Sequence, residues 1–126
     1  MATTHSTAAR DASANAVVDL LDAGTPPGFL VFLTSGDVTV CTITMETTAF
    51  GASSAGVATM ALGGGKTSDG ATAGTIAKAE FTNAAGTAVI FCACGTSGSD
   101  INIPGGLALA TDDTVTVTSL TYTAPA

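Results

Sequence analysis

The sequence is poor in charged residues, and those it has are mostly acidic. Only 10% of its 126 residues are charged, and three lysines and arginines stand against ten aspartates and glutamates. The net charge of −7 argues against nucleic acid, whose phosphates need clustered basic side chains. It argues equally against an anionic membrane surface. We therefore expect neither nucleic acid nor membrane among the partners.

Aromatic and histidine side chains, the usual materials of a ligand site, are also scarce. The chain has no tryptophan and a single tyrosine, Tyr122, which disfavours a sugar-binding face. Its one histidine, His5, precedes the first helical segment, close to the N-terminus. A histidine that activates a nucleophile must be held rigidly beside it, which such a position does not favour. No calcium-binding loop pattern occurs. These deficits predict a protein that is not an enzyme and holds neither cofactor nor metal.

Long apolar runs are missing as well. The longest, Ala88–Cys94, is too short to span a bilayer, and residues 1–11 lack the apolar segment of a secretion signal. With its few aromatic residues, the core must be built from valine, isoleucine, leucine, phenylalanine and small side chains. A chain of this length has one domain by default and buries enough surface for one real core.

The three cysteines, Cys41, Cys92 and Cys94, form no disulfide framework, which fits a reducing compartment. Cys92 and Cys94 would lie on one face of a strand, about 7 Å apart along it. Zinc sites prefer the tight turn of a C-x₂-C knuckle and need three or four ligands. We interpret the cysteines as buried small hydrophobic residues. The alternative, a metal site, requires all three to meet His5.

A glycine-rich stretch from Met60 to Gly70 contains Gly-Lys-Thr, the core of a nucleotide-binding P-loop. That motif needs a glycine six residues before the lysine, yet Met60 stands at that distance from Lys66. A P-loop also opens a helix, whereas residues 68–75 are poor in helix formers. We interpret residues 63–74 as a pliable loop, in which Gly64 and Lys66 follow a neighbour's surface and Lys66 meets an acidic group there.

The chain begins with a predicted α-helix from Ser6 to Ala23. Ser6 or Thr7 can cap its N-terminus, and Gly24 with the two prolines after it ends the helix. The expected packing face is narrow and rich in alanine: Ala9, Ala12, Ala16 and Leu20, with Val17 and Leu21 beside them. The polar residues expected on the opposite face are Arg10, Asp11, Asn15, Asp19 and Asp22. The helix should lie close against its own sheet or a neighbouring subunit.

Everything after the helix reads as short strands separated by turn residues. The predicted strands are Phe29–Thr34, Val38–Met45, Val57–Leu62, Thr75–Thr82, Thr87–Cys94, Ile101–Ile103, Leu107–Leu109 and Asp113–Thr123. The SGD and NAAG turns predict two hairpins. The fold class is therefore mainly β, an N-terminal helix followed by an antiparallel β-sandwich or jelly roll of about eight strands. Residues 1–24 would form an arm and helix, and residues 25–126 a single globular sandwich domain.

The alternation of apolar residues changes phase within two of these strands. Val38 and Val40 occupy even positions, whereas Cys41, Ile43 and Met45 occupy odd positions. The apolar side chains therefore change from one face of the strand to the other. The last strand changes in the same way after Val117. A β-bulge would explain each change. The alternative is a strand that buries one face early and the other face late, as when it passes from its own core into a subunit contact.

Four stretches resemble small structural proteins encoded in tailed-bacteriophage genomes: ATTHSTAARDASANAVVDLLDAG at the start, DTVTVTSLTYTAPA at the finish, and FLTSGD and AFGASSAGVAT between them. Such β-rich proteins include capsid cement (decoration) proteins, sandwich or jelly-roll domains that bind the outer head lattice as dimers or trimers. The resemblance implies a virion protein on the capsid exterior, made in the bacterial host cytoplasm. Its partners would be the major capsid protein and copies of itself.

A surface of threonine, serine, glycine and alanine is easily desolvated, so we expect other subunits to cover part of it. We expect at least one chain end, represented by Thr3 and His5 or by Tyr122 and Pro125, to pack on a neighbouring chain. Phe50 is more often a core residue in such a loop than an interface anchor. A tail- or fibre-associated module that contacts a host receptor or glycan is the alternative function.

Overall fold

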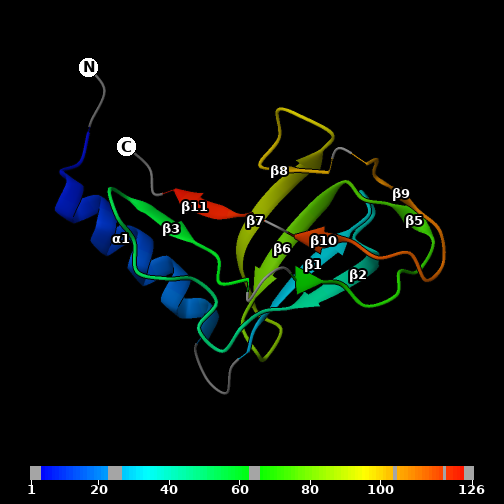
Figure 1. Ribbon diagram of the computed structural model, residues 1–126, viewed down its shortest axis with the longest axis horizontal. Coiled ribbons are helices and arrows are strands. Elements are labelled where there is room, and N and C mark those ends of the chain that lie inside the picture. The colour runs from blue at the N-terminus through cyan, green and yellow to red at the C-terminus, as the bar shows by residue number, and fades with distance from the viewer. Residues whose placement is uncertain (1–3, 23–26, 63–65, 104, 118, 124–126) are drawn as a thin grey trace.

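The fold of the protein is mainly β, with one α-helix at its N-terminal end (Figure 1). The computed structural model describes residues 4–22, 27–62, 66–103, 105–117 and 119–123. The elements are α1 (Thr7–Asp19), a 3₁₀ turn (Leu20–Asp22), β1 (Phe29–Leu33), β2 (Thr39–Thr44), β3 (Val57–Thr59), β4 (Lys66–Thr67), β5 (Gly74–Thr75), β6 (Lys78–Thr82), β7 (Ala88–Gly95), β8 (Ile101–Asn102), β9 (Ala108–Leu109), β10 (Thr116–Val117) and β11 (Thr121–Thr123).

The largest sheet has five strands in the order β2-β1-β6-β7-β8. Both predicted hairpins are confirmed, because β1 pairs antiparallel with β2 and β6 pairs antiparallel with β7. The expectation of a purely antiparallel sheet is wrong at β8, which runs parallel to β7 through two residue pairs. The other strands form three separate two-stranded pairs, β10 with β4, β11 with β3, and β5 with β9.

The core lies against one face of the five-stranded sheet. Leu30 in β1 sits opposite Ile43 on one side and Phe81 on the other, and all three are buried. The Phe50 ring meets the Phe81 ring edge-on, with centroids 5.8 Å apart. Phe50 is only 4% exposed, so the preferred interpretation of Phe50 as a core residue is confirmed. As the composition indicated, the remaining core residues are aliphatic or small, apart from the buried Phe32.

The first change of phase is a β-bulge. Phe32 pairs with Cys41, but the next residue, Leu33, pairs with Thr39, so Val40 is the extra residue. The bulge places both Val40 and Cys41 in the core, although they are adjacent in sequence.

The second change of phase has a different cause, and the prediction of one strand over Asp113–Thr123 is wrong. Within the described residues, β10 pairs with β4, whereas β11 pairs with β3 in another sheet. The chain therefore changes partner between Val117 and Thr121. The sequence offered, as the alternative to a bulge, a strand that passes from its own core into a subunit contact. The chain does pass from one contact to another here, but both partner strands belong to the same chain.

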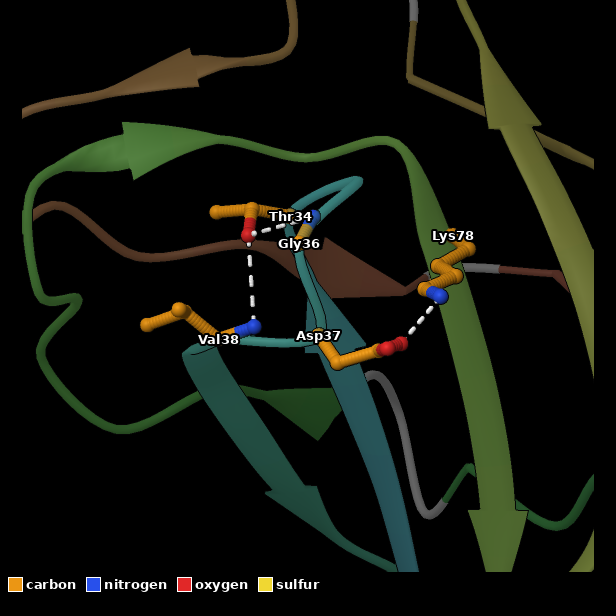
Figure 2. A network of polar contacts seen from close by, with 5 residues as sticks. All are labelled: Thr34, Gly36, Asp37, Val38 and Lys78. Atoms are coloured by element: carbon orange, nitrogen blue, oxygen red, sulfur yellow. Dashed lines mark hydrogen bonds and ion pairs between the residues drawn. The ribbon is translucent and has the colours of Figure 1, made fainter.

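The turn between β1 and β2 is organised by the side chain of Thr34 (Figure 2). Its Oγ1 accepts hydrogen bonds from the backbone N–H of Gly36 at 3.3 Å and of Val38 at 3.2 Å. Asp37 holds a positive φ of 67° at the tip, a conformation that aspartate tolerates better than most residues. Its carboxylate forms an ion pair with Lys78 of β6, so the turn is tied to the neighbouring strand (Figure 2).

The glycine-rich segment is more ordered than the sequence indicated, and the prediction of a pliable loop over residues 63–74 is wrong for its described part. Residues 66–67 and 74–75 are strands. Between them, Asp69 exchanges two hydrogen bonds with the backbone of Thr42 in β2, at 2.8 and 3.0 Å. The Ser68 hydroxyl, which is buried, accepts from Val115 N–H at 2.9 Å. Residues 63–65, including Gly64, lie outside the described part.

The helix begins as predicted, because the Ser6 side chain accepts from Ala9 N–H as an N-cap. The predicted packing face is wrong for Ala9, Ala12, Ala16 and Leu20, which are exposed. Leu21, which was predicted beside that face, is buried, together with Ala14 and Val18. The helix packs against β3 and β11, which lie beside it in Figure 1.

Polar side chains decide which face of the helix is buried. Asp11 accepts from Gly56 N–H at 2.7 Å and from the Ser53 hydroxyl at 2.9 Å. Asn15 accepts from Ser53 N–H at 2.9 Å, and Asp22 accepts from Ala49 N–H at 2.9 Å. These three residues were expected to face solvent. They instead hold the loop before β3, because that loop offers N–H groups that no strand satisfies.

Gly56 is required where this loop meets the helix. Its φ is +79°, which glycine adopts without steric cost. A Cβ at this position would lie 2.9 Å from Nε of Arg10, so even a methyl group would displace the arginine side chain.

We expect Asp11→Ala to lower the free energy of unfolding by about 2 kcal/mol, because it removes the acceptor of two hydrogen bonds. Asp19→Ala is the matched control, since Asp19 is an exposed aspartate of the same helix. We expect the control to change stability by less than about 0.5 kcal/mol. Urea denaturation measures both, and equal losses in the two variants would contradict this role of Asp11.

Candidate interaction surface

The seven residues selected from the sequence as contact residues do not gather at one place. Thr3, Gly64 and Pro125 lie outside the described residues. His5 is exposed just before α1, and Phe50 is in the core.

The other two contact candidates lie in strands. Lys66 lies in β4, where its Nζ is 2.7 Å from Oε1 of Glu46, so the acidic group that it meets belongs to its own chain. Because Lys66 lies in a strand, it does not stand at the start of a helix, as the lysine of a P-loop does. Tyr122 lies in β11 and is half-buried against the core.

The three cysteines are free and take different positions in the fold. Cys41 is buried in the core, and Cys92 and Cys94 are half-buried against it on the inner face of β7. Within the described residues, no group of three histidine, cysteine, aspartate or glutamate side chains is arranged to hold a metal ion. The packing interpretation of the cysteines therefore fits their positions.

Burial makes these thiols weak acids. Burial raises the pKa of Cys92 from its ordinary value of 9.0 to about 11, and the negative charge of Asp100 adds to the effect. Burial likewise raises the pKa of Cys94 to about 11, with further contributions from Cys92 and Asp100. Burial also raises the pKa of Cys41. A thiol is reactive as the thiolate, so none of the three is suited to nucleophilic catalysis near neutral pH.

The raised pKa values of Cys92 and Cys94 predict that the folded protein loses stability at alkaline pH. The folded protein keeps these thiols protonated where the unfolded chain has begun to lose its protons. Their contribution is therefore complete below about pH 9 and is lost as the pH rises toward 11. We expect urea denaturation to show a steeper alkaline loss of stability in the native protein than in a Cys92→Ser/Cys94→Ser variant. Parallel pH profiles would contradict this.

The most exposed large apolar side chain of the described residues is Phe91, which is 70% exposed in the middle of β7. It lies opposite Glu80 in β6, which in turn lies opposite Val31 in β1. Paired residues of adjacent strands share a face, so Val31, Glu80 and Phe91 form a row, here called the outer row, on the sheet face away from the core.

Phe91 is the functional candidate that the sequence reasoning missed. The run Ala88–Cys94 was interpreted only as an apolar strand. The alternation along this run could have identified Phe91. Ile90, Cys92 and Cys94 lie on one face of the strand, so Phe91 lies on the opposite face. The sequence could not show that Phe91 stays 70% exposed among the described residues.

None of the helices in the described part of the chain combines the length and the apolar content that crossing a membrane requires. Comparison with protein-family models, curated proteins and solved structures found no match to this chain.

Proposed function

We propose that this protein is a non-enzymatic virion structural protein, a cement protein that binds the outer lattice of a phage head and stabilises the shell. The proposal joins the resemblance of its sequence to phage structural proteins with one structural observation. That observation is Phe91, a phenylalanine 70% exposed on an open sheet face. Phenylalanine is among the residue types that are enriched at protein interfaces relative to the rest of the surface.

The composition of the outer row supports a contact with protein. Val31 and Phe91 flank one carboxylate, that of Glu80. Aromatic residues are enriched at the centres of protein interfaces, where a few of them supply most of the binding energy. Since only 10% of the residues are charged, little desolvation of charge opposes burial of the surrounding surface.

We propose the finer fold class as an irregular β-sandwich. The five-stranded sheet would be one layer, and the pairs β10–β4, β11–β3 and β5–β9 would together make an interrupted second layer. Core residues come from both groups, including Leu30 and Phe32 from the sheet and Ala58 and Val117 from the pairs. This arrangement leaves the outer face of the five-stranded sheet free for a partner.

In this role the protein works by surface burial repeated over a symmetric lattice. One specific interface usually buries about 1,600 Å² in total. Many copies, each as a dimer or trimer on the major capsid protein, would add such contacts over the whole shell. Location on the capsid exterior and assembly in the host cytoplasm follow from this proposal.

The role is tested by mixing the purified protein with phage heads that lack it, followed by sedimentation and a heat-resistance assay. We expect Phe91→Lys to lose at least tenfold in affinity, since central aromatic residues commonly contribute more than 1 kcal/mol. Leu20→Lys is the matched control, because Leu20 is 54% exposed on the helix and lies outside the outer row. We expect this control to bind normally.

Absence of binding by the native protein would contradict the cement role and leave the tail or fibre role standing. Equal losses in both variants would contradict the assignment of the outer row. The thermal midpoint of each variant, measured alone, shows that neither substitution has unfolded the protein.

A further inference from the structure

Two adjoining cavities lie between the five-stranded sheet and the C-terminal strands. The larger, of about 620 Å³, is bordered by residues 100–103 on one side and by residues 114–117 and 119–121 on the other. The smaller, of about 420 Å³, extends from there toward Phe81 and Ile90. The two share Asp100, Ile101, Leu120 and Thr121, so they make one continuous groove, here called the β8–β10 groove.

Both walls of the β8–β10 groove are strand edges without a strand partner. Among the described residues, β8 is the last strand of its sheet and pairs only with β7. On the opposite wall, β10 pairs only with β4, and β11 pairs only with β3. A free strand edge presents backbone N–H and C=O groups that can pair with another chain.

The lining of the groove combines apolar and polar side chains. Ile90 and Leu120 line it and are only half-buried, beside Asn102 and several threonines. The core is therefore less completely covered here than under β1, where Leu30 is fully buried. A chain segment laid in the groove would finish the burial of these side chains.

We propose that the β8–β10 groove accepts an extended segment of another polypeptide as an added β-strand. The backbone of the segment pairs with the free edge of β8 or β10, and its alternate side chains pack on the half-buried Ile90 and Leu120. The groove has the size of a small-molecule pocket, for which about 300–1,000 Å³ is usual. Its walls nevertheless favour a peptide, because only a peptide offers backbone groups in register with strand edges.

Charge indicates the character of the added strand. Asp100 is the only charged residue that lines either cavity, and one of its carboxylate oxygens accepts from Ala93 N–H at 2.9 Å. A carboxylate offers about four acceptor positions, so the group can still bind a cation. The added strand therefore carries a lysine or arginine near Asp100.

The basic residue comes from a different protein rather than from a second copy. This chain has three lysines and arginines. Lys66 is paired with Glu46, Lys78 is paired with Asp37, and Arg10 packs beside Gly56 with its Nε buried. The inference goes beyond the proposed cement role and does not depend on it, because it concerns strand pairing at β8 and β10, whereas the cement role concerns the exposed ring of Phe91, which borders only the smaller cavity.

The test selects a yeast-displayed library of randomised nine-residue peptides on the immobilised full-length protein. We expect an enriched family with alternating apolar residues and one lysine or arginine. A synthetic member of the family should slow amide hydrogen exchange in residues 101–103 or 116–117. Failure to enrich such a family, or slower exchange confined to other strands, would overturn the proposal.

Matched variants locate the site. Thr121 lines both cavities and is exposed, so Thr121→Lys should block the groove without unfolding the protein and should weaken the peptide at least about tenfold. Thr87→Lys makes the same change at an exposed turn and should bind as the native protein does. Asp100→Asn should weaken the peptide but have little effect on a version whose basic residue is replaced by glutamine.

Three further outcomes would count against the proposal. Equal binding by Thr121→Lys and the native protein would place the peptide elsewhere. A concentration-dependent dimer of the native protein that Thr121→Lys abolishes would make a second copy the occupant. Binding of 1-anilinonaphthalene-8-sulfonate in the groove without any enriched peptide would make it a pocket for small apolar molecules.

Discussion

The structure depends on side-chain oxygens that accept hydrogen bonds from backbone amides. Strands of two or three residues satisfy few of their own N–H groups, and a buried amide without a partner costs about 1–3 kcal/mol. Five aspartates supply acceptors for backbone amides in loops or within strands β2 and β7: Asp11, Asp22, Asp69, Asp100 and Asp113. Half of the ten acidic residues therefore serve the backbone of their own chain.

Three of these aspartates, Asp69, Asp100 and Asp113, are exposed, so they satisfy backbone amides while their charge stays at the surface. The same constraint orients the helix. Its alanine face has little area to bury, whereas Asp11 and Asn15 satisfy amides that would otherwise lack partners. Hydrogen bonding to the loop before β3 therefore outweighs the small apolar gain of the alanine face.

Two features of the fold are left without a partner among the described residues. The outer row exposes Phe91, which also borders the smaller cavity. The chain between Val117 and Thr121 changes from one partner strand to another, and the β8–β10 groove lies beside that change. Short strands that each pair only once leave free edges, so the construction that holds the loops together also leaves room for added partners.

The sequence by itself determined the elements whose signals are local. Ser6 as the helix cap, the two hairpins and the bulge at Val40 could all be predicted, because capping, turn chemistry and alternation act within a few residues. The tertiary structure alone decided what covers each surface. It turned Asp11 inward, divided the last strand between two partners and left Phe91 uncovered. These outcomes depend on which amides and apolar faces remain unsatisfied after distant segments meet, and no local pattern records that.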